Sequence, residues 1–167
     1  MKKIIFSLSI VGLLFISSCG GDDDSTPMAV GLSGTINYDG QSYSIVNGIL
    51  GLSVEEGNAV GEFFMADGTI TATSTGVSTS DSQIIISVVA TSVGTATLGN
   101  GDYATSTDIP EKYADIQVTT SSGSKQAFTN GIVNISGSEN TYTISFDVPF
   151  GQGIELTGTV SGTYAAR

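Results

Sequence analysis

The chain of 167 residues has no histidine and no tryptophan, a single cysteine, three prolines and only five Lys or Arg residues. Without histidine it cannot form a Ser-His or Cys-His nucleophile pair, nor a zinc site with imidazole ligands. Without tryptophan it lacks the usual aromatic platform for sugar rings. These absences exclude several common hydrolase designs and favour a non-catalytic protein.

Positive charge is also scarce, because 16 Asp and Glu residues outnumber the five cations and give a formal net charge of −11. Such a polyanion is repelled by the phosphates of nucleic acids and by anionic lipid headgroups. We therefore expect no nucleic-acid partner.

Residues 1–18 have the features of an export signal. Lys2 and Lys3 precede an apolar run of 13 residues, 4–16, broken by two serines and one glycine. A membrane-spanning helix needs about 20 apolar residues, so this run has the length of a signal peptide core and is expected to be removed. The positive end stays in the cytoplasm, and the rest of the chain is exported.

The apolar run ends in Ile16-Ser17-Ser18-Cys19. This pattern resembles the lipobox of bacterial lipoproteins, in which one hydrophobic and two small residues precede the cysteine that is acylated and becomes N-terminal. Ile16 stands where Leu is commonest, and Ser18 where Gly or Ala is. The alternative is an ordinary signal peptide with an incidental cysteine. Because one cysteine in an exported chain cannot close an internal disulfide, lipidation of Cys19 is the preferred interpretation.

Residues 19–28 are predicted to be a flexible acidic tether, because glycines, like charges and a proline cannot bury apolar surface. Asp22, Asp23 and Asp24 resemble the acidic run by which lipoproteins of Bacteroidota reach the outer face of the outer membrane. The resemblance implies a lipid-anchored, surface-exposed protein that contacts the membrane through its acyl chains. A solvated spacer on a protein that faces the periplasm remains the alternative.

Residues 29–167 are expected to form one domain, in which hydrophobicity alternates with a period of two. Residues 32–38 alternate and end at Asp39-Gly40, a strong hairpin signal. Asn47-Gly48 indicates a second turn or a bulge. Residues 83–91 are apolar at both parities, which predicts a central strand covered on both faces. A single helical turn is expected at residues 110–113.

The clearest alternation comes last. Apolar residues from Tyr142 to Phe150 and from Ile154 to Tyr164 share one parity on either side of a glycine turn, which predicts a hairpin with one wet and one dry face. Residues 131–164 are similar to the closing strands of uncharacterised all-β lipoproteins of Bacteroidota. Eight or nine short strands predict an antiparallel β-sandwich, and a closed antiparallel β-barrel is the alternative.

A polar segment near the middle of the chain carries the best candidate binding residues. Its carboxylates could hold Ca²⁺ and its tyrosines could stack on a sugar ring; these residues are Asp102, Asp108, Glu111 and Asp115, with Tyr103 and Tyr113. The alternative is that the charges are solvated and the tyrosines cover the core edge, since the spacing is not that of an EF-hand loop.

Three functions are compatible with these patterns. The preferred one is a non-catalytic binding or adhesion module for a glycan or protein at the cell surface. The second is a structural or accessory subunit of an outer-membrane complex, and the third is a carboxylate-based hydrolase. The adjacent Glu55 and Glu56 do not support the hydrolase, because neighbours on a strand point to opposite faces rather than forming a catalytic pair.

The lipid assignment predicts that Cys19→Ala abolishes labelling by radioactive palmitate and leaves unprocessed precursor, because the acylated thiol is lost. Ser18→Ala is the matched control: it keeps a small residue before Cys19 and should be labelled normally. Labelling of Cys19→Ala would show that the anchor is elsewhere.

Overall fold

A computed structural model describes residues 31–73, 76–105, 111–127 and 130–167. The predicted export signal, Cys19, the acidic run 22–24, the predicted tether and Asp108 lie outside the described residues. Within the described part of the chain, no helix is long and apolar enough to span a membrane.

The described residues form strands joined by short connections. These are β1 (Gly31–Tyr38), β2 (Gln41–Ile45), β3 (Asn47–Glu55), β4 (Asn58–Ala66), β5 (Thr69–Thr73), β6 (Gly76–Ser80), β7 (Ile84–Ser92), β8 (Gly101–Thr105), β9 (Lys112–Thr120), β10 (Gly123–Gln126), β11 (Gly131–Ser138), β12 (Thr141–Gly151), β13 (Ile154–Thr163) and β14 (Ala165–Ala166). The predicted all-β class is therefore confirmed.

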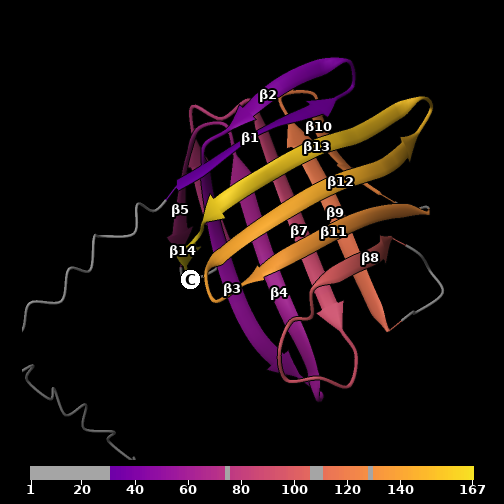
Figure 1. The fold of residues 1–167 in the computed structure, drawn as a ribbon. Helices are drawn as coiled ribbons and strands as arrows, with labels where there is room; N and C mark the ends of the chain where they lie inside the picture. Colours follow the sequence, from indigo (N-terminus) through magenta and orange to yellow (C-terminus); the bar gives the residue numbers. More distant parts are fainter. Residues whose placement is uncertain (1–30, 74–75, 106–110, 128–129) are drawn as a thin grey trace, which may run out of the picture.

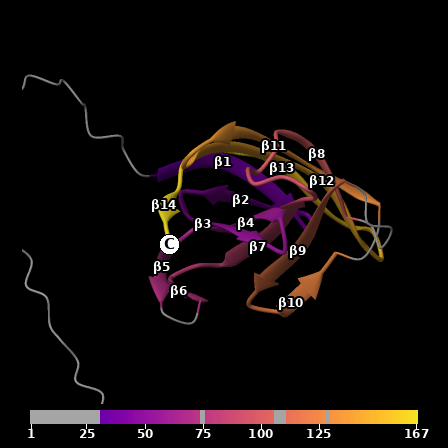
Figure 2. The same cartoon turned by 90° about the horizontal axis from the view of Figure 1, so that it is seen from below.

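Twelve of these strands form one sheet in the order β14-β3-β4-β7-β9-β8-β11-β12-β13-β1-β2, with β10 paired to β9, while β5 and β6 form a separate hairpin. The pairing is antiparallel except for β14 with β3 and one residue pair between β8 and β9. The sheet curls strongly into a half-barrel, and its two halves cross face to face (Figures 1 and 2). The predicted sandwich of eight or nine strands is therefore wrong.

The two halves belong to one sheet because β9 pairs with β8, at Tyr113 and Ala104. The chain also passes from one half to the other between β2 and β3. We call β14, β3, β4, β7, β9 and β10 the first half, and β8, β11, β12, β13, β1 and β2 the second half. Val46 is the single residue between β2 and β3; its C=O accepts from Leu32 N–H of the second half at 3.0 Å, and its N–H donates to Ala66 O of the first at 3.1 Å. A strand that bends in this way makes a corner between crossed layers.

The predicted break at Asn47-Gly48 is thus a corner one residue earlier, and both residues lie within β3. The expected helical turn is wrong over residues 111–113, where β9 already begins at Lys112. The strand predicted at residues 83–91 is β7, and it is central, between β4 and β9. Its concave-face residues are buried, whereas Ile85, Ser87 and Val89 on the convex face are only half-buried.

The core fills the concave side of the curl. Phe63 of β4 makes edge-to-face contacts with Tyr142 of β12 and with Tyr164, with ring centroids 5.3 and 5.4 Å apart. Such pairs stabilise by about 0.5–1.5 kcal/mol beyond the area they bury. They join the two halves, because the partners of Phe63 come from the second half and from the corner after β13.

The last hairpin is confirmed as sequence periodicity predicted. Tyr142, Ile144 and Val148 of β12 are buried, whereas the alternate residues face outward. The outward hydroxyl groups pair across β12 and β13, as in the contacts Thr143–Ser161 at 3.0 Å and Ser145–Thr159 at 2.9 Å. Hydrogen bonding of this kind leaves the convex face polar and solvated.

Glycines let the strands of the second half coil tightly. A Cβ added at Gly158 of β13, whose φ is +127°, would lie 2.2 Å from Thr35 O of β1. One added at Gly34 would lie 2.2 Å from Thr159 O. Glycine kinks of this kind allow a sheet to curve, because no side chain occupies the inside of the bend.

We predict that Gly158→Ala lowers the free energy of unfolding by about 3 kcal/mol or more, because it adds a clash to an unfavourable φ. Gly153→Ala is the control: its φ is +78° and nothing lies within 4 Å of the added Cβ, so it should cost only about 1 kcal/mol. Urea denaturation measures both. Equal losses would contradict the close approach at Gly158.

Tyr164 generates a second prediction, because its hydroxyl is buried without a hydrogen-bond partner among the described residues. Tyr164→Phe removes that group, so it should raise the free energy of unfolding by about 1 kcal/mol. Burial also raises the pKa of Tyr164 far above its usual value. In the unfolded chain the tyrosine ionises above about pH 10, so stability should fall as the pH rises beyond that point.

The Tyr164→Phe variant should show a shallower alkaline loss of stability than the native chain in urea titrations between neutral and alkaline pH. Tyr113→Phe is the control at neutral pH, because Tyr113 is only half-buried and its change should have little effect. A destabilised Tyr164→Phe variant would show that the hydroxyl has a partner in solution.

Candidate functional site

Two concavities lie at opposite ends of the strands of the first half. The larger, of about 390 Å³, we call the tyrosine cleft; it is lined by Tyr38, Asp39, Gln41, Tyr43, Ser82, Gln83, Thr120, Ser121 and Ser122. The smaller, of about 250 Å³, we call the apolar pocket; it is lined by Leu52, Ser53, Ala59, Val60, Ala96, Thr97, Leu98, Gly137, Ser138, Glu139 and Tyr142.

One wall of the tyrosine cleft is the hairpin of β1 and β2. The turn Asp39-Gly40 has positive φ at both residues, as the sequence predicted, and it sets Tyr38 and Gln41 opposite each other. Tyr38 is buried edge-to-face against Phe150, with ring centroids 5.4 Å apart. Tyr43 is half-exposed and donates its hydroxyl hydrogen to Gln41 Oε1 at 2.8 Å. The cleft thus has a fixed aromatic base and one accessible ring.

The opposite wall comes from the start of β7 and the turn after β9. Asp67 Oδ1 accepts the backbone N–H groups of Gln83 and Ile84 at 2.9 and 3.1 Å, which fixes the chain where it enters β7. In the turn after β9, the hydroxyls of Thr120 and Ser122 are 2.8 Å apart. Both walls are therefore held by hydrogen bonds.

The chemistry of the tyrosine cleft is that of neutral polar recognition. Its described lining contains amides, hydroxyls and the carboxylate of Asp39, and it includes no Lys or Arg to balance an anionic ligand. Burial raises the pKa of Tyr38, with smaller contributions from Asp39 and Tyr43, so its hydroxyl remains a neutral donor. Such groups can exchange hydrogen bonds with a polyhydroxylated molecule, while the Tyr43 ring offers a stacking face.

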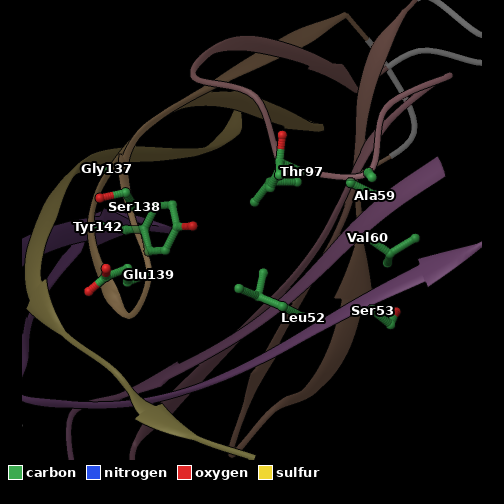
Figure 3. A pocket seen from close by; sticks show the side chains of 11 residues that line it. Leu52, Ser53, Ala59, Val60, Thr97, Gly137, Ser138, Glu139 and Tyr142 are labelled. Atoms are coloured by element: carbon green, nitrogen blue, oxygen red, sulfur yellow. The ribbon is translucent and has the colours of Figure 1, made fainter.

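The apolar pocket has a different character. Figure 3 shows Leu52 of β3 and Tyr142 of β12 on either side of it. Ala59 is buried, whereas Leu52 is 51% exposed. Leu98, from the loop after β7, is packed against the main core. This pocket suits an apolar group rather than a sugar.

The three described calcium candidates, Asp102, Glu111 and Asp115, do not all lie at one place. Asp102 points from the convex face of β8 and accepts a hydrogen bond from Asn134 Nδ2 at 2.7 Å. Glu111 shares a shallow depression with Asp102, but Asp115 lines another one with Glu55 and Glu56. In the part of the chain that the structure describes, no three carboxylates are grouped to hold a metal ion.

Tyr103 is placed as a core residue rather than a stacking platform. It is fully buried in β8, and burial raises its pKa. Its hydroxyl lies 2.8 Å from Ser92 Oγ and donates to Gly99 O. It therefore fastens the loop between β7 and β8, and its ring is not available for a sugar.

Tyr113 lies on the other side of the sheet from Tyr103. Ala104 pairs with Tyr113, and Ala114 next to Tyr113 is buried, so Tyr113 faces the convex side while Tyr103 faces the core. The two tyrosines do not form a common surface. Sequence reasoning missed Tyr38 and Tyr43, although two tyrosines on either side of a two-residue turn were a usable signal.

Comparisons of the chain with protein-family models, with curated proteins and with solved structures found no match. The function is therefore inferred from the residues and geometry of this chain.

Proposed function

We propose that this chain is a lipid-anchored, surface-exposed outer-membrane protein whose β domain binds a neutral glycan in the tyrosine cleft. Support for the anchor comes from the sequence: the charged and apolar signal, the lipobox-like residues before Cys19 and the acidic run 22–24. Removal of residues 1–18 leaves three cations against 16 acidic residues, a formal net charge of −13. A domain of that charge stays soluble beside an anionic surface.

The observation that carries the glycan assignment is the lining of the tyrosine cleft. Hydroxyls and amides from two separate walls converge on one opening beside the accessible ring of Tyr43, with no cation among them. This combination matches a ligand that is rich in hydroxyls and carries no charge. Asp39 is the only carboxylate in the described lining, whereas glycoside hydrolysis commonly needs two, so binding without cleavage is favoured.

The position of the cleft agrees with this function. The tether would join the domain at Gly31, where β1 begins, and Tyr38 stands at the other end of the same strand. An eight-residue strand spans about 25 Å, so the cleft opens well away from the point of attachment. A ligand outside the cell would reach the cleft without competition from the anchor.

We predict that Tyr43→Ala weakens binding to a neutral oligosaccharide by at least about tenfold, because it removes the stacking ring and the hydroxyl that organises Gln41. An array of neutral and anionic glycans identifies the ligand, and titration calorimetry with the purified full chain measures the affinity. Tyr113→Ala, a half-buried tyrosine outside the cleft, is the control and should bind normally.

Three outcomes would contradict the proposal. The first is that no neutral glycan binds, and the second is that the glycan bound most tightly is insensitive to Tyr43→Ala. The third is a preference for anionic glycans, which is inconsistent with a cleft that lacks cations in its described lining.

A further inference from the structure

The outer edge of β3 is only partly covered. On one side β3 pairs with β4 along its whole length, from Asn47 to Glu55. On the other side β14 pairs with Ile49 and Leu50 alone, and Arg167 N–H donates to Leu50 O at 2.9 Å. Beyond Leu50, no described residue pairs with this side of β3. We call residues 51–55 the open edge.

The direction of the free backbone groups follows from the pairing. In a strand, the N–H and C=O of alternate residues point to the same side. Because Leu50 O points toward β14, the N–H and C=O groups of Leu52 and Val54 also point away from β4. The open edge therefore presents a row of donors and acceptors that another extended chain could continue.

The open edge also carries apolar side chains. Leu52 is 51% exposed and Val54 56% exposed, and both share the parity of Leu50, which is buried. Exposed edges in soluble proteins are usually protected by lysine, proline or a bulge. The open edge reads Gly-Leu-Ser-Val-Glu and has no lysine or proline.

The open edge adjoins the apolar pocket. Leu52 forms part of its wall, facing Tyr142 across the opening (Figure 3). A strand added beside β3 would direct alternate side chains to the same face as Leu52, and so toward this pocket. Recognition by strand addition uses this combination: backbone hydrogen bonds supply affinity, and a pocket for an alternate side chain supplies specificity.

We propose that the open edge and the apolar pocket form a docking site for an extended segment of a partner protein. The segment would pair with the backbone of Leu52 and Val54 and insert one apolar side chain into the pocket. Glu55 and Glu56 lie at the end of the edge and Glu139 at the rim of the pocket, and all three are exposed. The partner segment therefore carries lysine or arginine beside its apolar residue.

This charge also argues against a second copy as the occupant. The chain has a formal net charge of −11, so two copies that met at these edges would bring like charges together. The docking site is separate from the tyrosine cleft, and this proposal does not depend on glycan binding.

Amide hydrogen exchange measured by NMR on the full chain in detergent micelles tests the edge itself. The amides of Leu52 and Val54 should exchange rapidly in the protein alone, because neither has a described backbone partner. Protection of these amides in dilute protein, or protection that grows with protein concentration, would mean that the chain itself covers the edge, and either result would overturn the proposal.

Partner chemistry is tested with acetylated peptides of about eight residues that alternate threonine and valine, carry a lysine at each end and have Leu, Ile, Met or Phe at the centre. At least one should slow exchange of both amides by about tenfold or more. N-methylation of the peptide backbone should abolish the effect. The proposal fails if no peptide protects these amides at about millimolar concentration, or if N-methylated peptides protect equally.

Substitutions distinguish peptide binding at the open edge from nonspecific binding to other exposed apolar residues. Leu52→Lys and Val54→Lys should each weaken peptide binding by about tenfold or more, because they add charge to the apolar row and repel the peptide lysines. Their unfolding midpoints should change little, since both side chains are more than half exposed. Ile132→Lys, an exposed aliphatic residue on β11, is the matched control and should leave binding unchanged. Equal losses in all three variants would overturn the proposal.

Discussion

Contact between the two halves of one sheet is the constraint on which the structure depends. Phe63 of the first half packs edge to face on Tyr142 of β12 in the second half and on Tyr164, which follows β13. A sheet can bury one face against itself only if it bends sharply, and the bend needs glycines where the strands approach. Gly34 and Gly158 meet this need, since a Cβ at either position would overlap the next strand.

The same bend creates the surfaces that can serve function. Because the halves cross rather than align, they separate toward the ends of the strands and leave the tyrosine cleft at one end and the apolar pocket at the other. The chain turns between the halves at Val46 and at Tyr164, and backbone hydrogen bonds hold both corners. Beyond the second corner, β14 pairs with Ile49 and Leu50 of β3, while Leu52 and Val54 farther along β3 are exposed.

The positions of the candidate binding residues depend on strand pairing that local sequence patterns do not show. A polar segment with tyrosines and carboxylates indicated a loop, yet it contains β8, a strand whose inward residue is Tyr103. Its short length and mixed composition gave no clear period, and only pairing with β11 fixes which side Tyr103 faces. Tyr38 and Tyr43 were recognisable as strand residues beside a turn. Their role in a cleft depends on residues about 40 to 80 positions away, which no local pattern indicates.

The sequence by itself determined the all-β class, the turn at Asp39-Gly40 and the last hairpin, because turn chemistry and a period of two are local properties of the chain. It also carries the whole basis for expecting an anchor at Cys19. Only the tertiary structure decided that the strands form one curled sheet, that Val46 turns the chain between its halves and that β3 keeps an open edge. Periodicity shows which side of a strand is buried, but not which other buried face that side packs against. The packing partner depends on pairing between distant strands and on the space that glycine leaves.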